Sequence, residues 1–315
     1  MRYQEIQYPP FGRCLEVQHG YSHMILSLDF GPRVLAFTGP DRINVLFEDR
    51  NDIVTEQGEF YDNAYGKGTT WHIYGGHRLW SSPQDMYSYV PDNHPIQYEV
   101  SGETITLTPP PQDVTGLQFE LKVQCFDNVH VKIHHTITNI GPTTKRLAPW
   151  ALTVFKGEGL EIVPLPKDPC GLAPQRYISL WDFGAKANDS RQYFGDRYFT
   201  LTQDPSQYLP LKIGLRVVDG YAMYVWQELV FVKRFTHNDN VTYPDNNVNF
   251  ETYEDHRFIE METLGEFGDV PPGASVSLEE EWFLLNNHKG IPSATNEDEL
   301  NNFTRELLNR IGGPR

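Results

Sequence analysis

Apolar and polar residues alternate with a period of two along most of the chain. The segment 129–137 reads VHVKIHHTI, and the residues at odd and even positions therefore face opposite sides of an extended strand. Similar runs occur at 24–30, 96–100, 104–107, 117–123, 211–217, 222–225 and 275–284. Strands with one buried face produce this alternation. The pattern predicts an all-β protein built from stacked antiparallel sheets.

Turn-forming residues separate these runs. Ser-Gly-Glu at 101–103 predicts a hairpin loop between two short strands, and Asp-Gly at 219–220 predicts a second hairpin between 211–218 and 221–226. Three consecutive prolines at 109–111 end a strand, because proline cannot donate a hydrogen bond to a sheet.

One helix is predicted near the C-terminus. Asn296 is a suitable N-cap residue, Glu299 follows three residues later, and Gly312 provides a stop. Leucine, isoleucine and phenylalanine recur between them at helical spacing, at Leu300, Phe303, Leu307, Leu308 and Ile311. We expect this amphipathic helix to pack outside the sheets and to take no part in function.

Composition excludes several classes of function. The 315 residues carry a formal net charge of −16, which argues against nucleic acid and anionic membranes as partners. No apolar run is long enough for a signal peptide or a membrane span. The cysteines, Cys14, Cys125 and Cys170, form no metal-binding or disulfide pattern. We expect one cytoplasmic domain over residues 1–315, and its oligomeric state stays open.

A first candidate motif is Gly-Gly-His-Arg-Leu-Trp at 75–80. The two glycines permit a tight backbone and close approach by a ligand. His77 and Arg78 can hydrogen-bond hydroxyl groups, and Trp80 can stack on the apolar face of a pyranose. The alternative is a turn with a buried tryptophan and an exposed arginine, which this short motif fits equally well.

A second candidate motif contains two glutamates. Glu260 and Glu262 alternate with Ile259, Met261 and Thr263, so both carboxylates point to one face of the predicted strand. Acidic residues ordinarily face solvent. The apolar neighbours and a Pro-Pro-Gly turn at 271–273 favour a functional role over a solvated face.

These motifs, in their order, resemble the galactose mutarotase-like (aldose 1-epimerase) superfamily. Thr-Asn at 138–139 followed by Gly141 is similar to a turn of that family, and Glu-Met-Glu-Thr at 260–263 is similar to the segment that carries its catalytic base. The Gly-Gly-His-Arg-Leu-Trp segment is similar to one bacterial branch. The resemblance implies an antiparallel β-supersandwich from about residue 24 to 285, followed by the C-terminal helix.

The resemblance also implies a reaction and roles. Mutarotases interconvert the anomers of a free sugar by general acid and base catalysis, which needs no metal and no organic cofactor. Glu260 matches the base, and Glu262 would contact sugar hydroxyls. The acid histidine of the family has no counterpart at 147–155, where Trp150 could instead stack on a sugar. The acid role would pass to His77, which we prefer, or to His72, or be absent.

Two functions therefore remain open. The chain is expected to bind a small-molecule sugar, either as an aldose 1-epimerase-like enzyme or as a non-catalytic, lectin-like protein of the same fold. We expect His77, Arg78, Trp80, Trp150 and Glu260 to line one pocket. The polar residues at 245–249, including Asn249, would either line its rim or form a solvated loop. No metal is expected.

Overall fold

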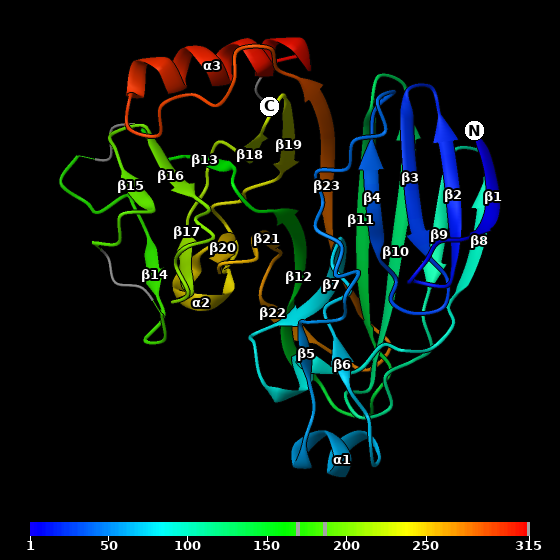
Figure 1. Cartoon of the computed structure of the whole chain (residues 1–315). Coiled ribbons are helices and arrows are strands. Elements are labelled where there is room, and N and C mark those ends of the chain that lie inside the picture. The colour runs from blue at the N-terminus through cyan, green and yellow to red at the C-terminus, as the bar shows by residue number, and fades with distance from the viewer. Residues whose placement is uncertain (168–170, 185–187, 314–315) are drawn as a thin grey trace.

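The computed structural model describes residues 1–167, 171–184 and 188–313, and two large antiparallel sheets dominate it (Figure 1). The first sheet contains, in spatial order, β1 (Arg2–Gln7), β2 (Arg13–His19), β3 (Ser22–Ser27), β4 (Val34–Thr38), β7 (His77–Ser82), β12 (Lys145–Lys156), β21 (Phe258–Leu264), β20 (Phe250–Glu254), β17 (Leu211–Leu215) and β14 (Ile178–Leu180), with β22 (Gly268–Val270) paired to β12. The second sheet contains β15 (Gln192–Phe194), β16 (Tyr198–Thr202), β13 (Leu160–Pro164), β18 (Tyr221–Trp226), β19 (Leu229–Phe235), β23 (Ser275–Asn286), β11 (His130–Asn139), β10 (Leu117–Phe126), β9 (Thr104–Thr108) and β8 (Gln97–Ser101). A small third sheet pairs β5 (Thr55–Glu56) with β6 (Trp71–His72).

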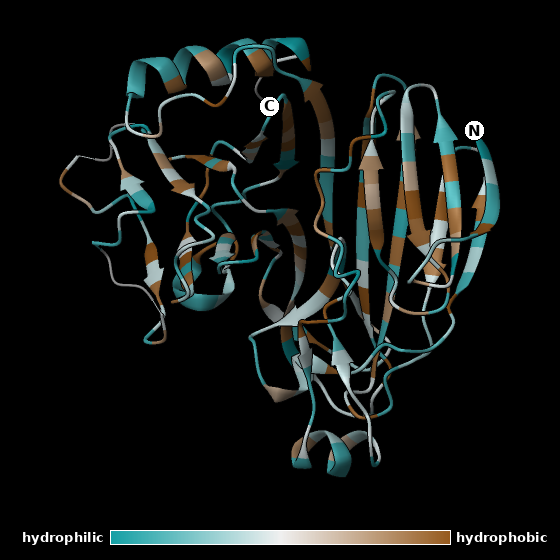
Figure 2. Ribbon diagram, in the orientation of Figure 1, coloured by the Kyte–Doolittle hydropathy of each residue, from teal (hydrophilic) through white to brown (hydrophobic). Residues whose placement is uncertain are grey.

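The period-two pattern of the sequence corresponds to real strands. In β11, buried and half-buried residues alternate along the whole strand, as the pattern at 129–137 predicts. Figure 2 shows the same mixture of hydrophobic and hydrophilic bands along the neighbouring strands. The large core lies between the two sheets, where Phe37, Phe231 and Trp282 are fully buried and their rings pack together. The all-β prediction is therefore confirmed.

Central strands depart from alternation because both of their faces are covered. All residues of β21 are buried, including Glu260 and Glu262, and β7 and β12 are buried along most of their length. Such strands present one face to the core between the sheets. Their other face lies beneath the segments 47–73 and 84–89, whose aromatic residues pack against it. This second face carries the candidate site.

The two predicted hairpins have different outcomes. Residues 102–103 connect the paired strands β8 and β9, and Gly102 has the positive φ of +60° that such a turn requires. The prediction for 219–220 is wrong, because β17 belongs to the first sheet and β18 to the second. Gly220 has a φ of +66°, so this turn carries the chain from one sheet to the other.

The predicted C-terminal helix is α3 (Glu297–Arg310), which packs on one face of the second sheet, over β13, β16, β18 and β19 (Figure 1). Asn296 caps it, since its Oδ1 accepts a hydrogen bond of 3.2 Å from the backbone N–H of Glu299. Leu300, Leu307 and Leu308 are buried against strands of the second sheet. The remaining helical segments are short: α1 (Glu59–Tyr65), η1 (Met86–Tyr89) and α2 (Pro244–Asn247).

No helix within the described ranges is both long and apolar enough to cross a membrane. Cys14 and Cys125 are buried free thiols, and burial raises the pKa of each to about 12. Cys170 lies outside the described residues.

Candidate functional site

Three adjacent strands of the first sheet bring the candidate residues together. In β12, Trp150 pairs with Trp80 of β7, and Leu152 lies between Arg78 of β7 and Glu262 of β21. Residues that are directly opposite on paired antiparallel strands point to the same face. The register therefore places both tryptophans, Arg78 and Glu262 on one face, and alternation adds Glu260.

A cavity of about 310 Å³ lies over this face, and we name it the small cavity. Arg78, Trp80, Trp150, Glu260 and Glu262 all line it. The other residues around it are Val54, Glu56, Trp71, Ile73, Gln84, Tyr89, Leu152, Phe183, Pro210, Lys212, Tyr253, Arg257 and Phe258. The volume is at the lower end of the range for small-molecule sites, and aromatic walls with a few charged groups are typical of them.

Glu260 is held by an arginine. Nη1 of Arg78 donates a hydrogen bond of 3.1 Å to Oε1 of Glu260, and both side chains are almost fully buried. The Arg78 guanidinium also lies 4.4 Å from the centre of the Trp80 ring. Burial raises the pKa of the Glu260 carboxyl, and the guanidinium opposes this effect. The net direction is upward, which favours proton exchange at Glu260 nearer to neutral pH.

Glu262 belongs to a second buried group. Its Oε2 accepts hydrogen bonds from Nε1 of Trp150, at 2.8 Å, and from Nζ of Lys212, at 3.3 Å. Lys212 also contacts Glu251, at 2.8 Å, and lies over the rings of Trp150 and Trp181. The two carboxylates raise the pKa of Lys212 against the effect of burial, so its ammonium stays charged. Burial raises the pKa of the Glu251 carboxyl, and the Lys212 cation opposes this effect, so one cation serves two buried glutamates.

Several buried polar atoms around the small cavity have no hydrogen-bond partner among the described residues. They are two donors, Nε of Arg78 and Nε1 of Trp71, and one acceptor, Oε1 of Glu262. A buried polar atom without a partner costs about 1–3 kcal/mol. A ligand with hydroxyl groups, which both donate and accept, would satisfy donors and acceptor together.

His77 does not line the small cavity, and its expected place beside Glu260 is wrong. Alternation along β7 turns His77 away from Arg78 and into the core between the sheets, where it is fully buried. Its Nδ1 lies 2.8 Å from Oγ1 of Thr153, and its ring packs edge-on against Trp282. The β7–β12–β21 sheet therefore separates His77 from Glu260.

His77 forms a hydrogen-bonded chain with His135. The Leu278 carbonyl can only accept, so Nδ1 of His135 donates to it at 3.0 Å, and Nε2 of His135 is left as an acceptor. Nε2 of His77 lies 2.7 Å away and donates to it. Burial lowers the pKa of both histidines, to about 4 for His135. Both rings are therefore neutral at pH 7.

His77, His135 and Glu280 also place three potential metal-ligand atoms within 4.8 Å of one another. The contact of 2.7 Å between the two histidine nitrogens is a hydrogen-bond distance, whereas two nitrogens about 2.0–2.1 Å from one tetrahedral zinc lie farther apart. Glu280 already contacts the Lys233 ammonium at 3.1 Å and the Trp282 indole at 2.8 Å. The cluster fits a hydrogen-bonded core better than a metal centre.

Two further sequence candidates lie away from the small cavity. His72 is on β6, where Nδ1 contacts Oδ1 of Asp52 at 2.5 Å, and it lines a different cavity. Asn249 is fully buried, and its side-chain amide makes two hydrogen bonds to the backbone of Val217. The expectation that Asn249 lines a cleft rim or a solvated loop is wrong, since it ties two segments together.

The glycine pair also has a different role from the expected one. A Cβ on Gly75 would lie 2.2 Å from the carbonyl oxygen of Phe47, and one on Gly76 would lie 2.3 Å from that of Val34. Both glycines have positive φ, of +90° and +69°. They permit neighbouring backbone, rather than a ligand, to approach the start of β7.

The residues of the small cavity that sequence reasoning missed include Trp71, Tyr89, Lys212 and Tyr253. The sequence offers one signal for Lys212, which is a lysine within the otherwise apolar strand Leu-Lys-Ile-Gly-Leu. In the structure all residues of that strand are buried. The partners of a buried lysine come from distant segments, so the sequence alone does not identify them.

Comparison with known proteins supports the fold. No protein-family model and no curated protein sequence matches the chain. Among solved structures, it resembles a galactose mutarotase-like protein of Lactobacillus casei, with 11% identity and a TM-score of 0.53 over 86% of this chain and 100% of that one. A galactose mutarotase-like protein of Clostridium acetobutylicum has 10% identity and a TM-score of 0.51 over 90% and 98%.

A galactose 1-epimerase of Lactobacillus acidophilus has 10% identity and a TM-score of 0.50, with 91% of this chain and 99% of that chain covered. These structures share the antiparallel architecture over nearly the whole chain, which agrees with the resemblance seen in the sequence. The protein therefore has the galactose mutarotase-like β-supersandwich fold.

Proposed function

We propose that the small cavity binds a sugar and that the protein is an aldose 1-epimerase-like enzyme. The observation that carries this proposal is the set of unpaired buried atoms, Arg78 Nε, Trp71 Nε1 and Glu262 Oε1, around an aromatic-walled cavity. The hydroxyl groups of a pyranose can accept hydrogen bonds from the two donors and donate one to the acceptor. Its apolar face can pack on the rings of Trp80 and Trp150.

Glu260 is the proposed general base. It removes the proton of the anomeric hydroxyl, and the raised pKa of its carboxyl makes it a more effective base than an ordinary solvated glutamate. Arg78 keeps the carboxylate oriented through the contact with Oε1. Glu262 and Lys212 position the other hydroxyls, and the neighbouring tryptophans exclude water.

The proton that ring opening requires at the ring oxygen has to come from a group other than histidine. The described lining of the small cavity contains no histidine, but it contains the phenols of Tyr89 and Tyr253. Tyr253 is the cross-strand neighbour of Glu260 in the β20–β21 pair. Burial raises the pKa of both phenols, so both stay protonated at neutral pH and can donate to the ring oxygen.

Polarimetry on freshly dissolved aldoses tests this proposal. The wild type is expected to accelerate the approach to anomeric equilibrium for at least one aldose, and Glu260→Gln is expected to lose about 10²- to 10⁴-fold of that rate. Tyr253→Phe and Tyr89→Phe distinguish the two candidate acids. If a sugar binds but no aldose is interconverted faster than spontaneously, the non-catalytic, lectin-like function replaces the enzyme. The cytoplasmic location expected from composition stays a prediction.

A further inference from the structure

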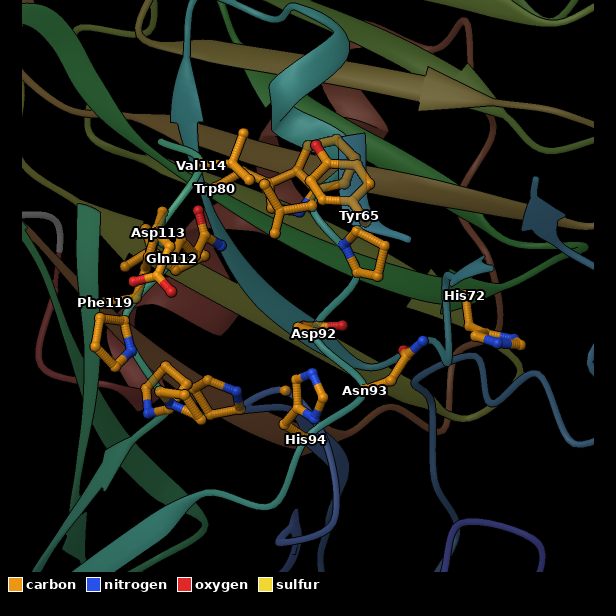
Figure 3. Close-up of a pocket in the computed structure, with 18 of the residues that line it drawn as sticks. Tyr65, His72, Trp80, Asp92, Asn93, His94, Gln112, Asp113, Val114 and Phe119 are labelled. Carbon is orange, nitrogen blue, oxygen red and sulfur yellow. The ribbon is translucent and has the colours of Figure 1, made fainter. Parts of the chain in front are cut away.

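A second cavity, of about 670 Å³, lies on the other side of Trp80, and we name it the large cavity. It is more than twice as large as the small cavity, and Trp80 lines both. In Figure 3, Tyr65 and Trp80 lie along one side of it and His94 on the opposite side, with Asp92 between them. The proposed reaction makes no use of this space.

Residues that are consecutive in the chain line different cavities. Trp71 faces the small cavity and His72 the large one, and the same holds for Tyr89 and Val90. The rings of Trp71, Trp80 and Tyr89 pack against one another with centroids 4.9 to 5.8 Å apart. The two cavities therefore lie back to back across one aromatic wall.

A buried ion pair lines the large cavity. Nη1 of Arg33 donates to Oδ2 of Asp92 at 2.5 Å, and the Arg33 side chain is only 2% exposed. Nε and Nη2 of Arg33 and Oδ1 of Asp92 are buried without a hydrogen-bond partner among the described residues. The pair therefore has two donor nitrogens and one acceptor oxygen available for hydrogen bonds to a ligand. They lie next to a cavity that is large enough for an organic molecule.

The surrounding backbone fixes this pair in place. The N–H of Gly31 donates to the Asp92 carbonyl at 2.9 Å, and the N–H of Arg33 donates to Oγ of Ser27 at 2.8 Å. The Asn93 amide donates to the Thr70 carbonyl at 2.7 Å and accepts from the Tyr74 hydroxyl at 2.8 Å. The large cavity is therefore built on segments that are hydrogen-bonded to one another.

We propose that the large cavity is a second binding site, for a neutral carbohydrate of at least two sugar units. A hydroxyl group accepts from Arg33 and donates to Asp92 at the same time, which neither a simple anion nor a simple cation does. Arg33 is the only lysine or arginine in the described lining, against the carboxylates of Asp92, Asp113 and Glu120. This charge disfavours phosphate, and the rings of Trp80, Tyr65 and Phe119 suit the apolar faces of sugars.

Isothermal titration calorimetry with methyl β-cellobioside, methyl β-maltoside and methyl β-lactoside tests the proposal. These glycosides have no free anomeric hydroxyl, so binding is measured independently of anomer interconversion. At least one of them is expected to bind the wild type. Asp92→Asn should weaken that binding by about tenfold or more, because it replaces an acceptor of a charged pair with an amide group.

Val114→Trp provides a variant that does not depend on the buried pair. Val114 is 49% exposed and lines the large cavity but not the small one, so an indole there narrows the cavity without disturbing the core. It should weaken glycoside binding while leaving the rate of anomer interconversion unchanged. Val218→Trp is the matched control, since Val218 is 37% exposed and lines neither cavity. It should bind the glycoside like the wild type.

Three results would overturn the proposal. In the first, none of the glycosides binds the wild type at millimolar concentration. In the second, Val114→Trp and Asp92→Asn both bind as the wild type does. In the third, inorganic phosphate competes with the glycoside for the cavity, which would mean an anion site. Because the small cavity is unchanged in both variants, failure of the enzyme proposal would leave these results interpretable.

Discussion

Nε2 of His77 lies 2.7 Å from Nε2 of His135 between the two sheets, while the next residue, Arg78, contacts Glu260 on the opposite face of β7. Adjacent residues of one strand therefore place their side chains in two separate environments. His77 belongs to a closed hydrogen-bonded core with Thr153, His135 and the Leu278 carbonyl. Arg78 belongs to the charged floor of the small cavity.

His77→Ala is expected to destabilise the fold and to spare the activity of folded molecules. The variant leaves a gap beside Trp282 and removes the partner of His135, which together cost on the order of 3 kcal/mol. Denaturant unfolding measures the stability, and anomer interconversion per folded molecule measures the activity. A stable variant that has lost its activity would return His77 to the catalytic role.

Glu161→Gln is expected to stabilise the protein at alkaline pH. Glu161 is fully buried, its Oε2 accepts from Thr252, and burial raises its pKa from 4.5 to about 8. Between these values the folded protein binds a proton that the unfolded chain releases. The wild type therefore loses stability as the pH rises through this window, by at most about 1.4 kcal/mol for each pH unit.

Glutamine at position 161 stays neutral and keeps an acceptor for Thr252. The difference in unfolding free energy between Glu161→Gln and wild type should thus be small near pH 5 and favour the variant near pH 8. Urea titrations at the two pH values measure it. A difference that does not change with pH would show that Glu161 titrates alike in the folded and unfolded states.

Lys212→Met is expected to be strongly destabilising. It leaves the buried carboxylates of Glu251 and Glu262 without their shared cation, and removal of one partner of a buried pair costs about 3–5 kcal/mol. Lys122→Met is a suitable control, because Lys122 forms a partly exposed ion pair with Glu120 and its loss should change stability by less than about 1 kcal/mol. Thermal unfolding of the two variants side by side makes the comparison; equal losses would contradict the role given to Lys212.

Substitutions of the two glutamates of β21 are expected to change different kinetic constants. Glu260→Gln should lower kcat, because it removes the base. Glu262→Gln should mainly raise KM, because Glu262 holds Lys212 and Trp150 and offers Oε1 to a sugar hydroxyl. Steady-state kinetics over a range of aldose concentrations separates the two effects. The roles of the two glutamates would be reversed if Glu262→Gln lowered kcat while Glu260→Gln left kcat unchanged.

The sequence predicts those features that depend on local periodicity. Alternation identifies most of the strands and places Glu260 and Glu262 on one face of theirs, and helical spacing with a cap residue at Asn296 identifies α3. The strand β7 (His77–Ser82), which carries Arg78 and Trp80, was not predicted. Alternation also implies that His77 and Arg78 point to opposite faces, but it does not say which face carries a cavity. That choice depends on which segments cover each face.

Other features depend on pairing between distant segments. Lys212 meets Glu262 only because β17, β20 and β21 are neighbours in the first sheet, and no local pattern encodes this order. The turn at 219–220 has the composition of a hairpin, yet its flanking strands join different sheets, because tertiary pairing overrides the local signal. Gly75 and Gly76 likewise need contacts with Phe47 and Val34 before their role becomes visible.

Exchange spectroscopy by NMR tests the central claim most directly. At anomeric equilibrium, magnetisation transfer between the α and β signals of an aldose reports the interconversion rate without any coupled assay. The claim predicts enhanced transfer with wild type, transfer near the spontaneous rate with Glu260→Gln, and wild-type transfer per folded molecule with His77→Ala. Full transfer with Glu260→Gln and none with His77→Ala would place the chemistry between the sheets and contradict the small cavity as the active site.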